Sequence, residues 1–373
     1  SKVALPELKR YGYSGGFSTA TLAAGGTLGI LIPPSVILVI YAILTEQNIA
    51  KLFLAAFVPG LLAALGYILT ISIYVRVNPE AAGVRAPVPW ATRLRNFLDV
   101  WPVVLVFGLV VGGIYVGWFT PTEGAAVGAA GTGIIALIGG NMSWTVFKEA
   151  ILVTASSTAM IFFIVLGAGI YNGFLALTQV PQELADWVVG QGFSPWTVLA
   201  LVLVFYLVFG CLMDSLSMIL LTIPIFFPVI SLMDFGFVDL AAMQAEAARE
   251  VLAAGVPEGM AAEMLAAIRE ALATGAELSR EQMQALGIRV TEGIANRIEA
   301  EQVAIWFGIL VLIVVEVGLI TPPVGMNLFI INSMDRETPM TETYKAVMYF
   351  VGSDIVRVII LVMFPAITLF LLP

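Results

Sequence analysis

Nine long apolar runs, separated by short polar stretches, dominate this sequence of 373 residues. A helix needs about 20 apolar residues to cross the hydrocarbon core of a bilayer, and these runs are of that order. Hydrophobic residues make up 60% of the chain and charged residues only 12%, which leaves too few polar side chains to cover a water-facing surface. We therefore predict an all-α polytopic membrane protein, and we exclude a soluble enzyme, a nucleic-acid binder and a disordered chain. The predicted spans are 16–47, 52–75, 100–118, 121–140, 151–177, 196–212, 216–232, 303–331 and 346–372.

The residue types on which many enzymes and metal sites depend are scarce. The sequence has no histidine, which excludes His metal sites, His catalytic triads and His proton relays. Its single cysteine, Cys211, lies in an apolar run and has no second cysteine with which to form a disulfide. No phosphate-binding loop, metal-ligand cluster or catalytic triad is evident in the sequence. We therefore expect no enzymatic activity and no cofactor.

The acidic residues are concentrated in one segment. The net charge of the chain is −9, and residues 236–302 alone contain 11 acidic and 5 basic residues. Residues 255–257 and Gly275 divide this segment into about three predicted helices, and Ser279 with Gln282 fits a capping box. The basic loops of the apolar part fall on the opposite side of the membrane, so the positive-inside rule places the acidic segment outside the cytoplasm. It is either a solvated helical elaboration or a docking surface for a partner.

Two of the apolar runs are interrupted in the middle by the same pattern. Gly29 is followed by Pro33 and Pro34, and Gly318 is followed by Pro322–Pro323 at the same spacing, so both segments read Gly-x-x-x-Pro-Pro. The two patterns form a weak internal repeat, offset by 289 residues. Paired interrupted helices in the two halves of a chain are the best sequence indication of the binding site of a secondary transporter.

The proline pairs predict backbone oxygens without helical partners. Proline has no N–H and cannot donate to the carbonyl four residues earlier, and an unsatisfied carbonyl in hydrocarbon costs several kcal/mol. A sodium ion is one candidate partner, with hydroxyl groups nearby, and the N-terminal end of each following half-helix can face an anion. The alternative is a proline kink stabilised by neighbouring helices or water. The carbonyls concerned are those of Gly29, Ile30, Gly318 and Leu319, and the hydroxyls are those of Thr27, Ser35 and Thr321.

Asp214 is the second candidate for ion binding. It lies between two short apolar runs, in a segment at 196–235 that we interpret as a re-entrant hairpin with Asp214 at its tip. A carboxylate deep in a membrane costs at least about 2.5–3.5 kcal/mol, which favours a functional role. Asp214 can also cap the following helix by accepting a hydrogen bond from the amide of Leu216 or Ser217. The two roles are compatible.

Other polar residues in apolar runs have simpler explanations. Glu123 fits a capping box at the start of a helix. Asp354 and Arg357, three residues apart, are predicted to pair near a membrane interface, whereas a role for Arg357 as a clamp for a substrate carboxylate is a weaker alternative. Glu316 is protonated, paired or functional, and Asn327 is placed to orient a polar substrate.

These features resemble the large membrane subunit of TRAP (tripartite ATP-independent periplasmic) transporters. The resemblance extends in family order over most of the chain outside the acidic segment. It is carried by GGTLGILIPPS at 25–35, KLFLA at 51–55, PG at 59–60, GWFTPTE at 117–123, GCLMD at 210–214, Pro224 and Pro228, WFG at 306–308 and GLITPPVGMNLF at 318–329.

The resemblance implies an elevator-type transporter of the ion transporter superfamily, built from inverted repeats. Each half of such a fold has a re-entrant hairpin followed by a broken helix, with a sodium site between hairpin tip and helix break. By this pattern we expect one sodium site at Gly26, Thr27, Gly29, Ile30, Pro33 and Pro34, and a second at Asp214, Ser215, Ser217, Gly318, Leu319, Thr321, Pro322 and Pro323. The expected substrate region contains Ser35, Gly325 and Asn327.

The resemblance also implies a function and partners. We expect sodium-coupled symport of a small organic acid, such as a dicarboxylate, across the bacterial inner membrane. A periplasmic binding protein would deliver this substrate, and a small membrane subunit would complete the transporter within the lipid bilayer. The alternatives are a stand-alone carboxylate or antiport carrier of the same superfamily, and a non-transporting fragment.

The predicted layout follows from these assignments. The chain begins with Ser1, and family members carry a substantial stretch ahead of the matching part, so the sequence is expected to lack most of the first hairpin. Residues 1–15 are its trailing end, 16–75 the first broken helix and the next span, and 76–195 interfacial helices, including 143–150, with scaffold spans. Then come the second hairpin at 196–235, the acidic insert at 236–302, the second broken helix at 303–335 and a final span at 336–373.

Overall fold

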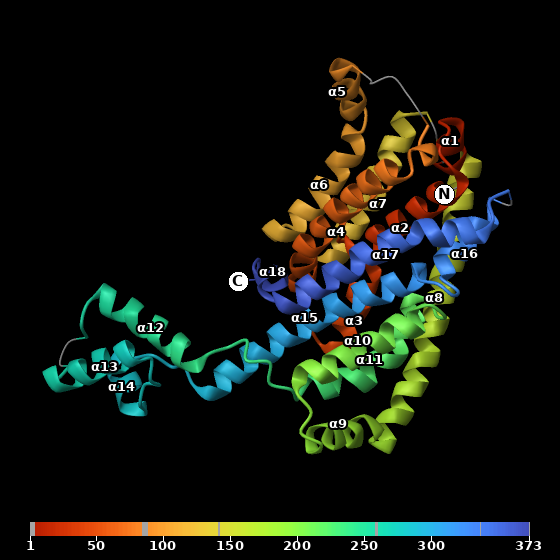
Figure 1. Ribbon diagram of the computed structural model, residues 1–373. Coiled ribbons are helices and arrows are strands. Elements are labelled where there is room, and N and C mark those ends of the chain that lie inside the picture. Colours follow the sequence, from red (N-terminus) through yellow and green to blue (C-terminus); the bar gives the residue numbers. More distant parts are fainter. Residues whose placement is uncertain (1–3, 84–88, 141, 258–259, 336, 373) are drawn as a thin grey trace. The chain divides into compact units, whose positions relative to one another are not determined.

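The computed structural model describes residues 4–83, 89–140, 142–257, 260–335 and 337–372. Every regular element in these ranges is helical, which confirms the all-α prediction (Figure 1). The chain forms two compact units, the first made of Ser1–Val229 with Ile305–Pro373 and the second of Ile230–Ala304. Among the described residues, five helices are long and apolar enough to cross a bilayer, and the bent pair Gly15–Leu31 and Val36–Thr45 makes a sixth if it counts as one span.

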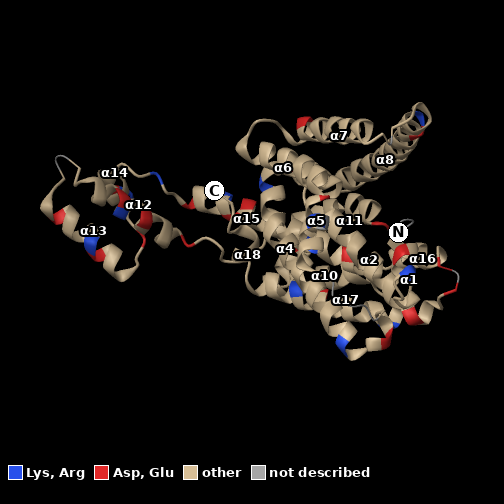
Figure 2. Cartoon of the chain, turned by 90° about the horizontal axis from the view of Figure 1, so that it is seen from above, with Lys and Arg blue, Asp and Glu red and all other residues tan. Residues whose placement is uncertain are grey.

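The first unit contains most of the apolar helices. Figure 2 shows few charged residues on them, in contrast to the second unit. The helices that lie wholly in this unit are α1 (Ala4–Arg10), α2 (Gly15–Leu31), α3 (Val36–Thr45), α4 (Ile49–Val77), α5 (Trp90–Leu98), α6 (Trp101–Val116), α7 (Pro121–Ile138), α8 (Trp144–Thr178), α9 (Val180–Gly190), α10 (Pro195–Gly210), α16 (Met326–Ser333), α17 (Met340–Met363) and α18 (Ala366–Leu369). A 3₁₀ turn covers Pro79–Ala81, and α11 (Ser215–Ser231) and α15 (Glu292–Ile320) extend across the unit boundaries.

Helices α2, α4 and α17 pack together in the first unit. Gly16 of α2 lies so close to α17 that an added Cβ would be 2.9 Å from the backbone of Glu342. The buried hydroxyls of Thr19 and Thr343 are 2.8 Å apart across the same contact. Tyr67 of α4 packs edge-on against Phe350 of α17, with ring centroids 5.4 Å apart. The close contact at Gly16 and the buried aromatic pair hold α17 against both partners.

Three helix boundaries differ from the prediction. The stretch 143–150, expected as a separate interfacial helix, is the first part of the continuous 35-residue helix α8. Helix α15 begins at Glu292, inside the segment 236–302 that we assigned to the insert, rather than at 303. In both cases no proline interrupts the helix, so local polarity did not end it. The final span ends at Met363, shortly before Pro365, and α18 follows.

Two predicted helix starts are confirmed by their hydrogen bonds. Thr120 and Glu123 form a capping box at α7, with the Thr120 amide donating to Glu123 Oε2 at 2.8 Å. Ser279 and Gln282 form the corresponding box at α14 (Arg280–Leu286), with the Ser279 amide donating to Gln282 Oε1 at 2.8 Å. Each box satisfies amide groups that the first helical turn leaves free.

Lys9 of α1 forms an ion pair with Asp335, with 2.6 Å between Nζ and Oδ1, and Asp335 is buried. Burial raises the pKa of Asp335, but the hydrogen bonds from Lys9 and Thr338 outweigh it and hold that pKa below its usual value. The hydrogen bond to Asp335 raises the pKa of Lys9.

The pH dependence of this contact follows from these two shifts. The stabilisation from Asp335 is complete above its unfolded pKa and is lost as the pH falls through the lower folded value. The stabilisation from Lys9 is complete below its unfolded pKa and is lost as the pH rises through the higher folded value. We expect Asp335→Asn to lower the hydrogen-exchange protection of the α1 amides at pH 7, and the wild type to show the same lower protection only at acid pH. Unchanged protection in the variant would contradict this.

The second unit contains the three helices expected in the acidic segment, α12 (Leu240–Ala254), α13 (Ala262–Thr274) and α14. Ala248, Ile268, Leu278 and Leu286 form its buried core. Gln244 is buried beside this core, accepts a hydrogen bond from the Leu278 amide at 2.7 Å and donates to the Val290 oxygen at 3.2 Å. This unit therefore has a hydrophobic core of its own.

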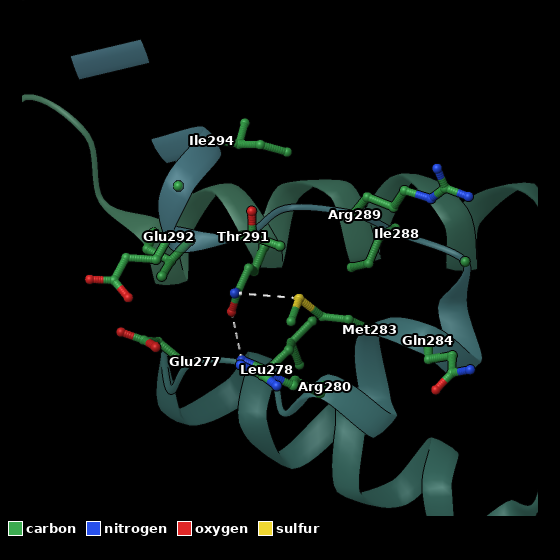
Figure 3. Close-up of a pocket in the computed structure, with 14 residues that line it drawn as sticks. Glu277, Leu278, Arg280, Met283, Gln284, Ile288, Arg289, Thr291, Glu292 and Ile294 are labelled. Atoms are coloured by element: carbon green, nitrogen blue, oxygen red, sulfur yellow. Dashed lines mark hydrogen bonds between the residues drawn. The ribbon is translucent and has the colours of Figure 1, made fainter. Parts of the chain in front are cut away.

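A cavity of about 1060 Å³ lies within this second unit (Figure 3). Charged side chains of both signs line it, among them Glu277, Arg280, Arg289 and Glu292. Neither helix break and none of the predicted ion ligands contributes to it. It is therefore distinct from the candidate site described next.

Candidate functional site

The first helix break lies between α2 and α3, whose axes are bent by 44°. The amide of Ile32 still donates to the Leu28 oxygen at 2.9 Å, and the next two residues, Pro33 and Pro34, have no N–H to continue the helix. Ser35 caps α3, with its Oγ accepting from the Leu38 amide at 3.4 Å. The predicted break is confirmed, and the peptide bond between its two prolines is cis.

Thr27 belongs to a buried chain of hydrogen bonds beside this break. Its hydroxyl donates to the Ala24 oxygen at 2.7 Å and lies 3.2 Å from the Tyr67 hydroxyl. Tyr67 donates to Asp354 Oδ2 at 2.7 Å, and Asp354 Oδ1 is 2.9 Å from Arg357 Nη2. The predicted pair of Asp354 and Arg357 is confirmed, and both side chains are buried. The sequence offered no signal for its link to Thr27, which runs through Tyr67, 287 positions from Asp354.

The glycines of the first break border open space. Gly26 and Gly29 are exposed, and a Cβ added to either would meet no other atom within 4 Å. Their backbone is therefore accessible.

The second break lies between α15 and α16, and its backbone is partly satisfied. The Thr321 amide donates to the Gly318 oxygen at 2.9 Å, and the Thr321 hydroxyl donates to the Val317 oxygen at 2.6 Å. The expectation that Pro322 leaves the Gly318 carbonyl unpartnered was therefore wrong, because the chain tightens into a 3₁₀-type turn before it leaves the helix. The peptide bond between Pro322 and Pro323 is cis.

A tyrosine that the sequence analysis missed completes this break. Tyr344 of α17 donates its hydroxyl to the Pro323 oxygen at 2.6 Å and lies 3.4 Å from the Val324 oxygen. Gly325 then adopts a positive φ of 56° and starts α16. No local sequence pattern predicts the Tyr344 contact, which depends on how α17 packs.

Helices α10 and α11 pack against each other as an antiparallel pair with the turn 211–214 between them. The Thr222 hydroxyl donates to the Tyr206 hydroxyl at 2.8 Å, and the Phe205 and Phe226 rings are 4.9 Å apart. In each of these pairs the two residues lie at similar distances along the sequence from residue 214, as in a hairpin. Asp214 accepts a hydrogen bond from the Ser217 amide at 2.9 Å, which confirms the predicted cap.

This hairpin turn touches the second break directly. A Cβ added to Gly318 would lie 2.7 Å from the Gly210 backbone and 3.1 Å from the Cys211 nitrogen. Two backbones approach this closely only where neither residue has a side chain. The structure therefore brings together two segments that the sequence analysis assigned to one site, although they are more than 100 residues apart.

Glu316 also lies in this region. It is 2% exposed, and neither of its carboxylate oxygens has a hydrogen-bond partner among the described residues. The Ser215 side chain lies close to this carboxylate, although its geometry falls short of a hydrogen bond. The role of Glu316 could not be assigned from the sequence, because its burial depends on the packing of α15 against the hairpin.

The predicted substrate residues are not joined to one another. Ser35 caps α3, Gly325 precedes α16, and Asn327 lies half-buried in the first turn of α16. Within the described ranges, no hydrogen bond connects Ser35 with either of the other two. They share only a position at the start of the half-helix that follows each break.

Comparisons with known proteins agree with this architecture. A family profile described as "Tripartite ATP-independent periplasmic transporter, DctM component" matches residues 1–367. The C4-dicarboxylate TRAP transporter large permease protein DctM of Pseudomonas aeruginosa is 32% identical over 98% of this chain and 70% of its own length. The isethionate TRAP transporter permease protein DctMQ of Oleidesulfovibrio alaskensis is 25% identical over 98% of this chain and 47% of its own length. The sialic acid TRAP transporter large permease protein SiaM of Vibrio cholerae is 30% identical over 59% of this chain and 51% of its own length.

Proposed function

This chain belongs to the family of the tripartite ATP-independent periplasmic transporter DctM component, and from that premise we propose that it carries a small organic anion in symport with sodium ions. Its relatives are named as transporter permeases, so the chain is a multi-pass membrane transporter subunit and not an enzyme. The observation that supports the proposal most directly is the contact of the hairpin turn with the second break at Gly210 and Gly318. The contact supports the proposal because carboxylate, hydroxyl and unwound carbonyl oxygens, which the turn and the break carry, are the ligands that alkali cations take in broken-helix transporters.

The proposed sodium ligands divide between the two breaks. In the first half, Thr27 is the buried hydroxyl, and the exposed backbone around Gly29 supplies carbonyl oxygens. In the second half, Ser215 and Thr321 supply hydroxyls beside the turn that carries Asp214. The complete proposed sets are Gly26, Thr27, Gly29, Ile30, Pro33 and Pro34 in the first half, and Asp214, Ser215, Ser217, Gly318, Leu319, Thr321, Pro322 and Pro323 in the second.

The proposed substrate is an organic acid that binds where the half-helices begin. A helix N-terminus favours anions because its amide groups are unpaired and its dipole is positive there. Ser35 precedes α3, and Gly325 and Asn327 mark the start of α16. The relatives are named for C4-dicarboxylates, isethionate and sialic acid, all of which carry an acidic group. A C4-dicarboxylate is our first choice, because the Pseudomonas aeruginosa relative matches nearly the whole chain.

The proposed partners are a small membrane subunit and a periplasmic substrate-binding protein, as the family implies. The proposed location is the bacterial inner membrane. Helix α8 is apolar and almost wholly exposed over its 35 residues, so lipid or another membrane subunit must cover it. The net charge of −9 disfavours nucleic acid as a partner.

Uptake into proteoliposomes containing the complete transporter tests the function. We expect radiolabelled succinate, presented with the binding protein, to accumulate only when sodium is higher outside than inside, and we would compare isethionate and sialic acid as alternative substrates. A proton gradient of equal size, without sodium, is the control. Uptake that follows the proton gradient and ignores sodium would contradict the proposal. Uptake without the binding protein would instead indicate a stand-alone carrier.

A further inference from the structure

Glu316 differs from the other buried acidic residues of the described chain. Asp335 is paired with Lys9 and Thr338, and Asp354 is paired with Arg357 and Tyr67. Glu316 is as buried as either of them, yet both of its oxygens lack a hydrogen-bond partner and no ion pair among the described residues includes it. A buried carboxylate in this state is costly unless a cation or a proton neutralises it. The fold thus buries a carboxyl group for which the described residues supply no partner.

The position of Glu316 indicates which kind of ligand would neutralise its carboxylate. It precedes Gly318 by two residues on α15, and Gly318 touches the hairpin turn at Gly210. Ser215, the first residue of α11, lies close to its carboxylate. A carboxylate and a hydroxyl beside an unwound segment are oxygen donors for a hard cation.

The internal repeat shows that this charge belongs to one half only. The offset of 289 residues that aligns Gly29 with Gly318 also aligns Thr27 with Glu316. Thr27 is neutral, and its hydroxyl is already bonded to the Ala24 oxygen and to Tyr67. Equivalent positions beside the two breaks therefore carry a satisfied hydroxyl in one half and an unsatisfied carboxylate in the other.

We propose that Glu316 is a direct carboxylate ligand of a monovalent cation in the second half of the protein, with Ser215 Oγ beside it, and that its charge makes this half bind the cation more tightly. The inference rests on the proposed sodium coupling and deepens it by naming a ligand outside the set that the repeat predicts. Cation binding leaves the buried region neutral, so it removes the cost of the isolated carboxylate.

Binding of sodium alone to the complete purified transporter tests the inference. Thermal unfolding midpoints are measured across a NaCl titration at constant ionic strength, with choline chloride as the replacement salt. We expect Glu316→Gln to raise the sodium concentration for half-maximal stabilisation at least tenfold. Glutamine imitates the protonated acid in size, so a space-filling, protonated Glu316 would give a smaller change, and that result would overturn the inference. Glu123→Gln is the matched control, because it removes a carboxylate of the same length from a capping box. It should leave the sodium concentration for half-maximal stabilisation unchanged.

A second variant covers the case in which Glu316→Gln does not fold. Glu316→Asp keeps the carboxylate but shortens the side chain by one methylene. We expect the sodium concentration for half-maximal stabilisation to rise at least threefold. An unchanged concentration would overturn the inference. The wild type separates the two proposals: if sodium drives its uptake but Glu316→Gln binds sodium normally, only the role of Glu316 fails. If sodium neither stabilises the wild type nor drives its uptake, the sodium coupling itself fails.

Discussion

Gly318→Ala is expected to reduce sodium-dependent uptake at least tenfold. The added methyl group would lie 2.7 Å from the Gly210 backbone, closer than any real Cβ contact, so the hairpin turn and the second break would have to separate. Overpacking of this kind costs about 1–3 kcal/mol in a well-packed interior. We therefore expect a lower thermal unfolding midpoint for the purified transporter together with the loss of uptake in proteoliposomes.

A matched control is available in α7. A Cβ added to Gly133 meets no other atom within 4 Å, so Gly133→Ala should change neither uptake nor stability appreciably. Uptake by Gly318→Ala within twofold of the wild type would show that the contact between hairpin and break is not needed for transport.

Arg357→Met is expected to destabilise the first unit by about 3–5 kcal/mol, because it leaves the Asp354 carboxylate buried without its cation. Tyr67 would still donate to that carboxylate, but a single neutral hydrogen bond does not balance a full charge. The effect is measured as the loss of thermal stability of the purified protein in detergent.

The double variant Asp354→Leu with Arg357→Met separates charge from packing. It removes both charges, so most of the lost stability should return. If the double variant were as unstable as Arg357→Met alone, the cost would come from lost packing around the guanidinium rather than from an isolated charge.

The helices and both breaks could be predicted from the sequence because their causes are local. Long apolar runs define the spans, and a proline pair after Gly29 or Gly318 interrupts the helix wherever the segment lies in the fold. The caps at Thr120 and Ser279 also follow from residues within one helical turn. The helix starts at Trp144 and Glu292 were placed too late, because polarity was read as a boundary where no helix-breaking residue stands.

The partners of the site residues could not be predicted, because they come from distant segments. Tyr344 reaches the oxygen of Pro323, and Tyr67 reaches Asp354 across 287 positions. The Gly318 oxygen was expected to be free but is satisfied by Thr321, since a helix end can tighten in a way that the proline pattern does not reveal. The isolation of Glu316 likewise became visible only from packing.

Helix α17 contacts the second break through Tyr344 near its start, and ten residues further on Asp354 is linked through Tyr67 to Thr27, beside the first break. At a rise of about 1.5 Å per residue, the two contact points are about 15 Å apart on one continuous helix. A rearrangement that moved Thr27 away from Tyr67 would disturb the chain of hydrogen bonds that ends on Asp354 of α17. A tilt of α17 that moved Asp354 would therefore also move Tyr344, which donates to the Pro323 oxygen.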